Sequence, residues 1–210
     1  MTRPLPSASD RPIERLVLAS GNAGKLRELG VLLAPLGFEL LSQSALGVDP
    51  PPETGTTFRD NALLKARHAS SRTGLPAVAD DSGIEVEALG GRPGVYSARY
   101  ARDGASDLEN LNKLLEELKH VPEGRRNARY RCVIAFVRNA TDPAPVLAEG
   151  SWEGSIVQQP RGSGGFGYDP AFLPEGHSQT AAELAAHEKN AVSHRGKALR
   201  ALVRKLGPRA

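Results

Sequence analysis

Short apolar runs alternate with amphipathic helical segments along most of this 210-residue sequence. Residues 15–19 (RLVLA) and 38–41 are typical of short buried strands, and residues 77–79 begin another. One intervening helical pattern places Leu26, Leu29, Leu33 and Leu36 on a single face. Because strands and helices are interleaved rather than grouped, the sequence predicts an α/β fold with a mixed central sheet.

Capping signals divide the chain further. A Ser or Thr followed three residues later by an acid marks a helix start, because each side chain can bond the other's backbone N–H. Three such pairs predict three helices: Thr57 with Asp60, Ser106 with Glu109, and Thr180 with Glu183. A last helix is expected from near Ser193 to Gly207, and two longer strands around 129–138 and 146–151.

Composition narrows the class of protein. The only cysteine is Cys132, so no intrachain disulfide can form, and no apolar run is long enough for a membrane span. The polar, proline-containing residues 1–13 are expected to be a disordered tail, followed by a single domain over residues 14–210. These features predict a cytoplasmic protein without a membrane partner. The net charge of +3 permits an anionic ligand without requiring one.

A candidate anion site lies between the first strand and the first helix. Its residues are Ser20, Gly21, Asn22, Ala23, Gly24 and Lys25. Glycines allow the backbone to approach a bulky anion, the helix N-terminus offers unpaired N–H groups, and lysine suits a phosphate. An ordinary strand-to-helix turn explains the segment equally well, and its spacing is not that of a P-loop.

Two adjacent acids, Asp80 and Asp81, interrupt the predicted strand that starts at residue 77. Neighbouring carboxylates among apolar residues are costly unless a cation compensates them. Side chains alternate along a strand, so only one of the two acids is expected to face a site. Mg²⁺ uses one or two carboxylates together with substrate phosphates, and Glu53 supplies a further carboxylate upstream. The alternative is a simple turn with a satisfied aspartate.

Two further segments carry candidate binding residues. In residues 164–170 (GGFGYDP), glycines around Phe166 leave an aromatic ring accessible for stacking on a nucleobase, and Asp169 could bond a base edge. A tight loop with buried aromatics is the alternative, particularly for Tyr168. In residues 189–195, Lys189, His194 and Arg195 form a cluster of donors at a helix start.

Five segments, taken in order, resemble the family of inosine/xanthosine triphosphate pyrophosphatases. They read SGNAGKLREL, ETGTTFRDNALLKA, ADDSGIEVEALGGRPGVYSARYA, GGFGYDP and KNAVSHRGKAL. The resemblance extends from about Leu16 to Leu206. It implies hydrolysis of dITP, ITP and XTP to the monophosphate and pyrophosphate, which removes deaminated purines before polymerases incorporate them.

The resemblance also implies roles for individual residues. Asp81 is similar to the family's catalytic carboxylate and magnesium ligand, and Glu53 to its second metal-associated acid. The loop from Ser20 to Lys25 looks like the family's phosphate loop, Lys65 like a phosphate-contacting lysine, and Ser82 like a neighbour of the substrate. The implied nucleobase pocket consists of Phe166, Gly167, Tyr168, Asp169, Lys189, His194 and Arg195.

The resemblance implies an elongated mixed sheet flanked by helices, with two lobes and an active-site cleft between them. It also implies a homodimer, the usual assembly of the family. One departure is Asp60, which stands where the family commonly has glutamate and receives no role here. Two alternatives stay open: a pyrophosphatase for other modified nucleotides, and a nucleotide- or nucleic-acid-binding module without catalysis. The adjacent acids argue against the second, so no stable nucleic-acid partner is expected.

Overall fold

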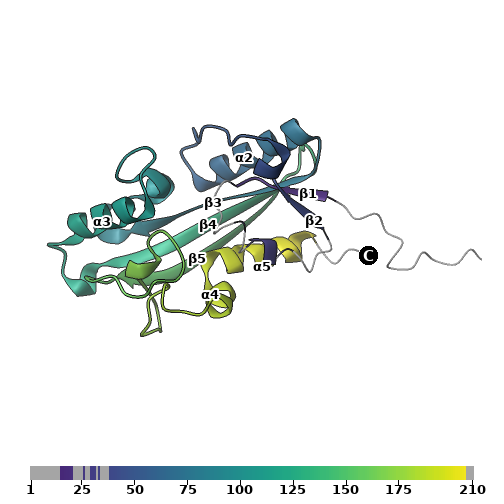
Figure 1. Cartoon of the computed structure of the whole chain (residues 1–210). Helices are drawn as coiled ribbons and strands as arrows, with labels where there is room; N and C mark the ends of the chain where they lie inside the picture. The colour runs from purple at the N-terminus through teal and green to yellow at the C-terminus, as the bar shows by residue number, and fades with distance from the viewer. Residues whose placement is uncertain (1–14, 21–25, 27–28, 32, 34–37, 207–210) are drawn as a thin grey trace, which may run out of the picture.

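The computed structural model describes residues 15–20, 26, 29–31, 33 and 38–206, so the predicted tail (residues 1–13) lies outside it. A six-stranded sheet runs through the elongated molecule in the order β2-β1-β3-β4-β5-β6 (Figure 1). The strands are β1 (Arg15–Leu18), β2 (Glu39–Ser42), β3 (Ala77–Val86), β4 (Asn127–Val137), β5 (Val146–Ile156) and β6 (Phe172–Pro174). β1 is parallel to β2 and β3, and the remaining pairs are antiparallel. The predicted α/β class with a mixed sheet is confirmed.

α2 (Phe58–Thr73) and α3 (Asp107–Leu118) begin where the capping signals place them. α2 is capped by Thr57, whose side chain accepts from the Asp60 N–H, and α3 begins with a complete capping box between Ser106 and Glu109. Asp60 itself accepts a 2.7 Å hydrogen bond from the Thr57 hydroxyl, so it serves as part of the helix cap. α4 (Ala186–Val192) and α5 (His194–Leu206) complete the main helices.

Helices cover both faces of the sheet at the end where β1 and β2 lie. α2 packs its alanines on one face, against Val133, Ala135 and Val137 of β4. α5 packs Leu199 and Leu202 on the other, in a cluster that includes the helical residues Leu29 and Leu33, as their predicted face requires. A Cβ on Gly150 would lie 2.2 Å from the His194 carbonyl oxygen, so α5 approaches β5 at backbone distance.

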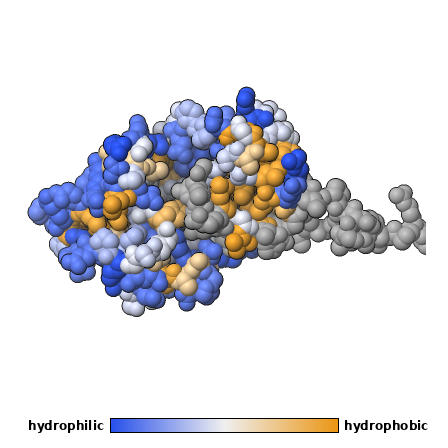
Figure 2. Space-filling view, viewed as in Figure 1, coloured by the Kyte–Doolittle hydropathy of each residue, from blue (hydrophilic) through white to orange (hydrophobic). Residues whose placement is uncertain are grey.

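A separate apolar cluster fills the far end of the molecule. There α3 packs Leu111, Leu114 and Leu118 against aromatic residues of β4, β5 and β6, including Tyr130, Trp152 and Phe172. In the view of Figure 2, the surface over this end is mostly hydrophilic, whereas hydrophobic residues gather toward the end that carries α2 and β1. The long strands β3, β4 and β5 connect the two ends (Figure 1).

Two predicted elements are wrong. Asp80 and Asp81 do not interrupt a strand: β3 continues through them, and both are paired with β4 in the ladder. Thr180 and Glu183 make their expected contact, from the Thr180 N–H to Glu183 Oε2 at 2.8 Å, but they stabilise a turn instead of a helix. The helix of this region is α4, which begins later at Ala186.

None of the helices in the described ranges is both long and apolar enough to cross a membrane.

Candidate functional site

The candidate site lies on β3 where its neighbour β1 ends. β1 pairs with β3 only at Val17↔Ala77 and Leu18↔Val78, and a bridge between Glu85 and Pro93 follows further along the same edge. Asp80, Asp81 and Ser82 lie between these two positions. Successive side chains of a strand point to opposite faces, so this segment presents side chains on both faces of β3.

A carboxylate–lysine cluster lies on the face covered by α2. The Lys65 ammonium group donates to Asp81 Oδ1 at 2.7 Å and to Glu53 Oε1 at 2.9 Å. Asn61, one turn before Lys65, donates to Asp81 Oδ2 at 3.2 Å and accepts from the Gly55 N–H at 2.8 Å. α2 thus supplies two buried polar side chains that fix Asp81 and tie the loop containing Glu53 to the helix.

The electrostatics of this cluster are those of a cation site. Burial opposes the charged form of Lys65, but the carboxylates of Asp81, Asp80 and Glu53 outweigh it and raise the pKa of the ammonium group above its usual value. Two carboxylates converge on one cation, so the same oxygens suit a divalent metal. In the described ranges no group of three or more His, Cys, Asp or Glu could hold a metal. Two carboxylates fit Mg²⁺, which takes its remaining ligands from phosphates and water.

Asp80 points to the opposite face of β3 and pairs with α5. Arg195 Nε lies 3.4 Å from Asp80 Oδ2, and its NH2 group donates to Ser82 Oγ at 3.1 Å. Ser82 in turn donates to Asp80 Oδ2 at 3.1 Å. Asp80 is 1% exposed and Arg195 is 2% exposed, so each charge needs the other.

An aromatic ring and two cations form the next part of this face. The Lys189 ammonium lies 4.9 Å and the Arg195 guanidinium 5.5 Å from the centroid of the Phe166 ring. Asp169 accepts from Lys189 at 2.8 Å and from the Phe166 N–H at 2.8 Å, which fixes both residues relative to each other. The predicted grouping of Phe166, Asp169, Lys189 and Arg195 is present in the structure.

His194 belongs to the buried aromatic cluster beside these residues. Its imidazole stacks on Tyr130 with ring centroids 4.6 Å apart and an interplanar angle of 7°. Burial raises the pKa of Tyr130 well above its usual value, and the nearby Asp169 carboxylate, which accepts its hydrogen bond, adds to this. Tyr130 therefore contacts both residues: it stacks on His194 and hydrogen-bonds to Asp169.

The remaining predicted residues fall into three groups. Tyr168 is buried, and its hydroxyl donates to the Ser97 carbonyl oxygen at 2.7 Å. It therefore fixes the loop from inside, which is the alternative that the sequence left open for this residue. The Gly167 N–H donates to Asp107 Oδ2 of α3 at 2.7 Å. Ser20 is buried directly after β1, while Gly21, Asn22, Ala23, Gly24 and Lys25 lie outside the described residues.

The sequence reading missed three contributors: Asn61, Arg99 and Tyr130. Arg99 donates to Glu53 Oε2 at 2.9 Å across a separation of 46 residues. Asn61 could have been found from helical spacing, because it lies four positions before Lys65 and so shares its face. Arg99 lies in one of the five segments that resemble the family, but its partner Glu53 is distant in sequence. No local pattern marks Tyr130.

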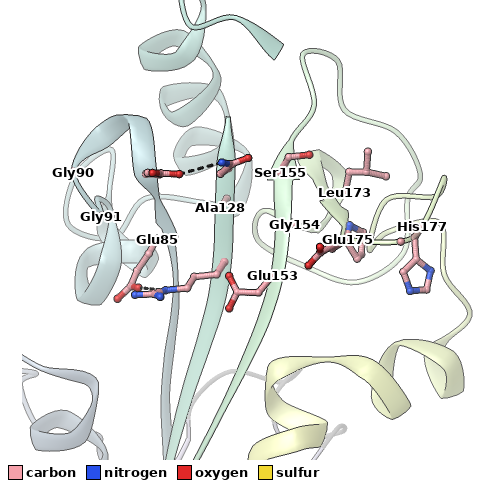
Figure 3. A pocket seen from close by; sticks show the side chains of 15 residues that line it. Glu85, Gly90, Gly91, Ala128, Glu153, Gly154, Ser155, Leu173, Glu175 and His177 are labelled. Carbon is pink, nitrogen blue, oxygen red and sulfur yellow. Dashed lines mark hydrogen bonds and ion pairs between the residues drawn. The ribbon is translucent and has the colours of Figure 1, made fainter. Parts of the chain in front are cut away.

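A groove of about 1000 Å³ lies elsewhere, over the far parts of β3, β4, β5 and β6. Figure 3 shows the carboxylates of Glu85, Glu153 and Glu175 around it, together with the ion pair between Arg129 and Glu85. None of the predicted site residues lines this groove. Its excess of acids would repel an anionic ligand, so Asp80–Ser82 remains the candidate site.

Comparison with known proteins matches this geometry to one family. The model of the Ham1 family matches residues 16–205. The dITP/XTP pyrophosphatase of Shigella flexneri is 56% identical over 191 residues, which cover 91% of this chain and 97% of the relative. The protein of the same name from Escherichia coli strain K12 is 53% identical over the same coverage.

Solved structures agree with the sequence relatives. The HAM1 protein from Coxiella burnetii superimposes with a TM-score of 0.85 at 49% identity, covering 92% of this chain and 98% of that one. The Ham1 protein of Staphylococcus aureus gives a TM-score of 0.80 at 36% identity, with the same coverage. The similarity therefore includes both ends of the sheet and the site between them.

Proposed function

The chain belongs to the Ham1 family, and on that premise we propose that it hydrolyses non-canonical purine nucleoside triphosphates, namely dITP, ITP and XTP, to the monophosphate and pyrophosphate. It is a nucleoside triphosphate pyrophosphatase with a house-cleaning role in nucleotide metabolism. One observation carries the assignment of its site. A carboxylate–lysine cluster and an aromatic–cation cluster lie on opposite faces of β3 and meet at Asp80–Ser82.

The carboxylate–lysine cluster suits the phosphate end of the substrate. Asp81 and Glu53 would hold the divalent metal that the family generally needs, and we propose Mg²⁺ because both ligands are hard carboxylate oxygens. When bound, the metal neutralises phosphate charge and lowers the pKa of water. Asp81 would accept the proton of the attacking water. Lys65, and the loop from Ser20 to Lys25, would share the remaining phosphate charge.

The aromatic–cation cluster suits the base. Phe166 would stack on the purine, while Lys189 and Arg195 would donate to the 6-keto oxygen of hypoxanthine or xanthine. A 6-amino group, as in ATP, would face these donors with another donor. Each unsatisfied buried group costs about 1–3 kcal/mol, so two contacts give on the order of 10²–10⁴-fold discrimination. Ser82, Gly167, Asp169 and His194 would complete this pocket, whereas Tyr168 supports it from inside.

Replacing Gly165 by alanine should damage the base pocket selectively. Gly165 has a φ of +71°, and an added Cβ would lie 2.1 Å from Asp169 Oδ2. Asp169 would have to leave Lys189 and the Phe166 N–H. We expect kcat/KM for dITP to fall about 10–100-fold, corresponding to the loss of one or two charge-assisted hydrogen bonds. Steady-state kinetics checks this, with Gly124→Ala as control because a Cβ there meets nothing within 4 Å. An unchanged kcat/KM would contradict the role of Asp169.

We also propose that residues 14–210 act as one domain and form a homodimer. The match to the Ham1 family over residues 16–205 supports a single domain. The homodimer is what the resemblance of the sequence to the pyrophosphatase family implies. Light scattering on the purified protein tests the dimer: a mass near 45 kDa, roughly twice the 22.3 kDa chain, supports it, and a mass near the chain's own contradicts it.

A substrate panel tests the proposed specificity. With Mg²⁺, kcat/KM for dITP, ITP and XTP should exceed that for ATP by on the order of 10² or more, because only ATP presents a 6-amino group to the donors of the base pocket. Modified pyrimidine triphosphates serve as the comparison class. If they are hydrolysed faster than dITP, the enzyme acts on other modified nucleotides and the proposed purine pocket is wrong.

A further inference from the structure

The short helix η5 (Gly94–Arg99) is fixed against the outer edge of β3, just beyond Asp80–Ser82. Ser97 Oγ accepts from the Ile84 N–H at 2.9 Å and donates to the Gly94 carbonyl at 2.6 Å. A Cβ on Gly83 would lie 2.3 Å from the Gly94 carbonyl oxygen, so the two backbones are in direct contact. η5 is therefore a rigid element beside the candidate site.

Arg99, the last residue of η5, reaches across to the loop that carries Glu53. Its NH1 group donates to Glu53 Oε2 at 2.9 Å, and its NH2 group donates to the Glu53 backbone carbonyl at 3.4 Å. The planar guanidinium thus binds the side chain and the backbone of the same residue. A rigid element is in this way connected to a segment without regular structure, residues 48–55.

Glu53 consequently uses each carboxylate oxygen for a different cation. Oε2 faces Arg99, while Oε1 faces Lys65, which also binds Asp81. Arg99 and Glu53 have side chains 25% and 27% exposed, so the pair is only partly screened by solvent. Without Arg99, Glu53 would lose the contacts to its Oε2 atom and to its backbone carbonyl, which restrain the carboxylate beside Lys65.

We propose that Arg99 is a positioning residue for the reaction: it orients the Glu53 carboxylate toward Lys65 and Asp81 without itself contacting the reacting atoms. The inference rests on the proposed function, because it gives Glu53 its role at the metal-facing side of the site. It assigns Arg99 a role that depends on Glu53, and this dependence distinguishes it from an arginine that binds a substrate phosphate directly.

A double-mutant cycle with Glu53→Gln tests this dependence. Arg99→Gln should lower kcat for dITP hydrolysis about 10–50-fold with a smaller change in KM, because it disturbs geometry more than substrate binding. In the Glu53→Gln background, the same change should cost less than about twofold, since residues that act as a unit are not additive. Arg99→Lys should recover part of kcat. Multiplicative losses, or a loss expressed only in KM, would overturn the proposal in favour of direct phosphate binding.

Hydrogen exchange provides a readout that does not depend on activity. Arg99→Gln should speed amide exchange in peptides covering residues 49–57 at least about threefold, because the loop loses its link to η5. Arg102→Gln is the matched control: Arg102 is nearby, pairs with Glu109 and is 61% exposed. Unchanged exchange in the Arg99 variant would overturn the positioning role. If Arg99→Gln exchanges faster than the wild type but the wild type does not hydrolyse dITP, the proposed function fails. The contact between Arg99 and Glu53 would still be shown to order the loop.

Discussion

Asp81→Asn should reduce the rate of dITP hydrolysis by about a thousandfold or more, because one change removes both the proton acceptor and a metal ligand. The substitution keeps the size of the side chain. In the wild type, the Asn61 amide donates to Asp81 Oδ2 at 3.2 Å and Lys65 donates to Oδ1. In the variant, the asparagine oxygen can still accept from Lys65, but its NH₂ group faces the NH₂ group of Asn61. Single-turnover kinetics, with enzyme in excess over dITP and with saturating Mg²⁺, measures the chemical step directly.

Asp142→Asn is the matched control for this variant. Asp142 is also a buried aspartate in an ion pair, with Arg138 at 3.0 Å, but it lies in the turn between β4 and β5. Its replacement should lower the melting temperature and leave the rate per folded molecule close to that of the wild type. If Asp81→Asn retained more than about a tenth of the wild-type rate, a catalytic role for Asp81 would be excluded.

Lys65→Met is expected to have the second largest effect, on both stability and rate. Lys65 is a buried cation between two carboxylates, and removing one partner of a buried pair costs about 3 kcal/mol or more. For a chain of this size, the melting temperature should fall by roughly 6–12 °C. The rate should fall about 100-fold, since a charge that stabilises the phosphates is lost.

The pH dependence of this contribution has a defined sign. The pKa of Lys65 is raised in the folded state, so its stabilising effect is complete below the usual lysine value of 10.5 and is lost only as the pH rises above it. At neutral pH the full difference between wild type and variant should therefore be observed. Thermal unfolding at pH 7 measures it.

Divalent metal separates a site effect from general destabilisation. Because the ammonium group and a metal would use the same oxygens of Glu53 and Asp81, Mg²⁺ should stabilise Lys65→Met more than it stabilises the wild type. Lys113→Met serves as control, since the Lys113 side chain on α3 is 40% exposed and its ion pair with Glu117 is long at 3.7 Å. Equal stabilisation of all three proteins by Mg²⁺ would show that the cluster is not a metal site.

Local signals predicted the start of α2, α3 and α5 and the general class of the fold. Thr57, Ser106 and their acidic partners are close in sequence, and their bonds form within one helical turn. The same logic failed at Thr180, where the pair forms but the following residues, Ala181 and Ala182, are buried against other segments. Tertiary packing there outweighs the local preference for a helix.

The prediction that Asp80 and Asp81 interrupt a strand was wrong for a different reason. The two charges were expected to break a strand because burying them alone is costly. In the structure, Lys65 compensates Asp81 on one face and Arg195 compensates Asp80 on the other. Arg195 lies 115 residues from Asp80, so no local reading could have found this compensation.

Residue type and motif order predicted the site residues, but they did not predict the residues that hold the site residues in place. Phe166, Asp169, Lys189 and Arg195 do come together, as expected from their segments. Tyr130 of β4 contacts His194 and Asp169, and Arg99 of η5 contacts Glu53, in each case across the fold. Their roles could not be predicted from sequence, because they follow only from the neighbours that the fold gives them.

The central claim is that water splits a purine triphosphate between its α and β phosphates at Asp81. ³¹P NMR of the protein with dITP and Mg²⁺ tests this most directly, because it identifies every phosphorus product. The triphosphate signals should be replaced by those of dIMP and pyrophosphate alone. The appearance of dIDP with orthophosphate, or dITP that stays intact, would contradict it.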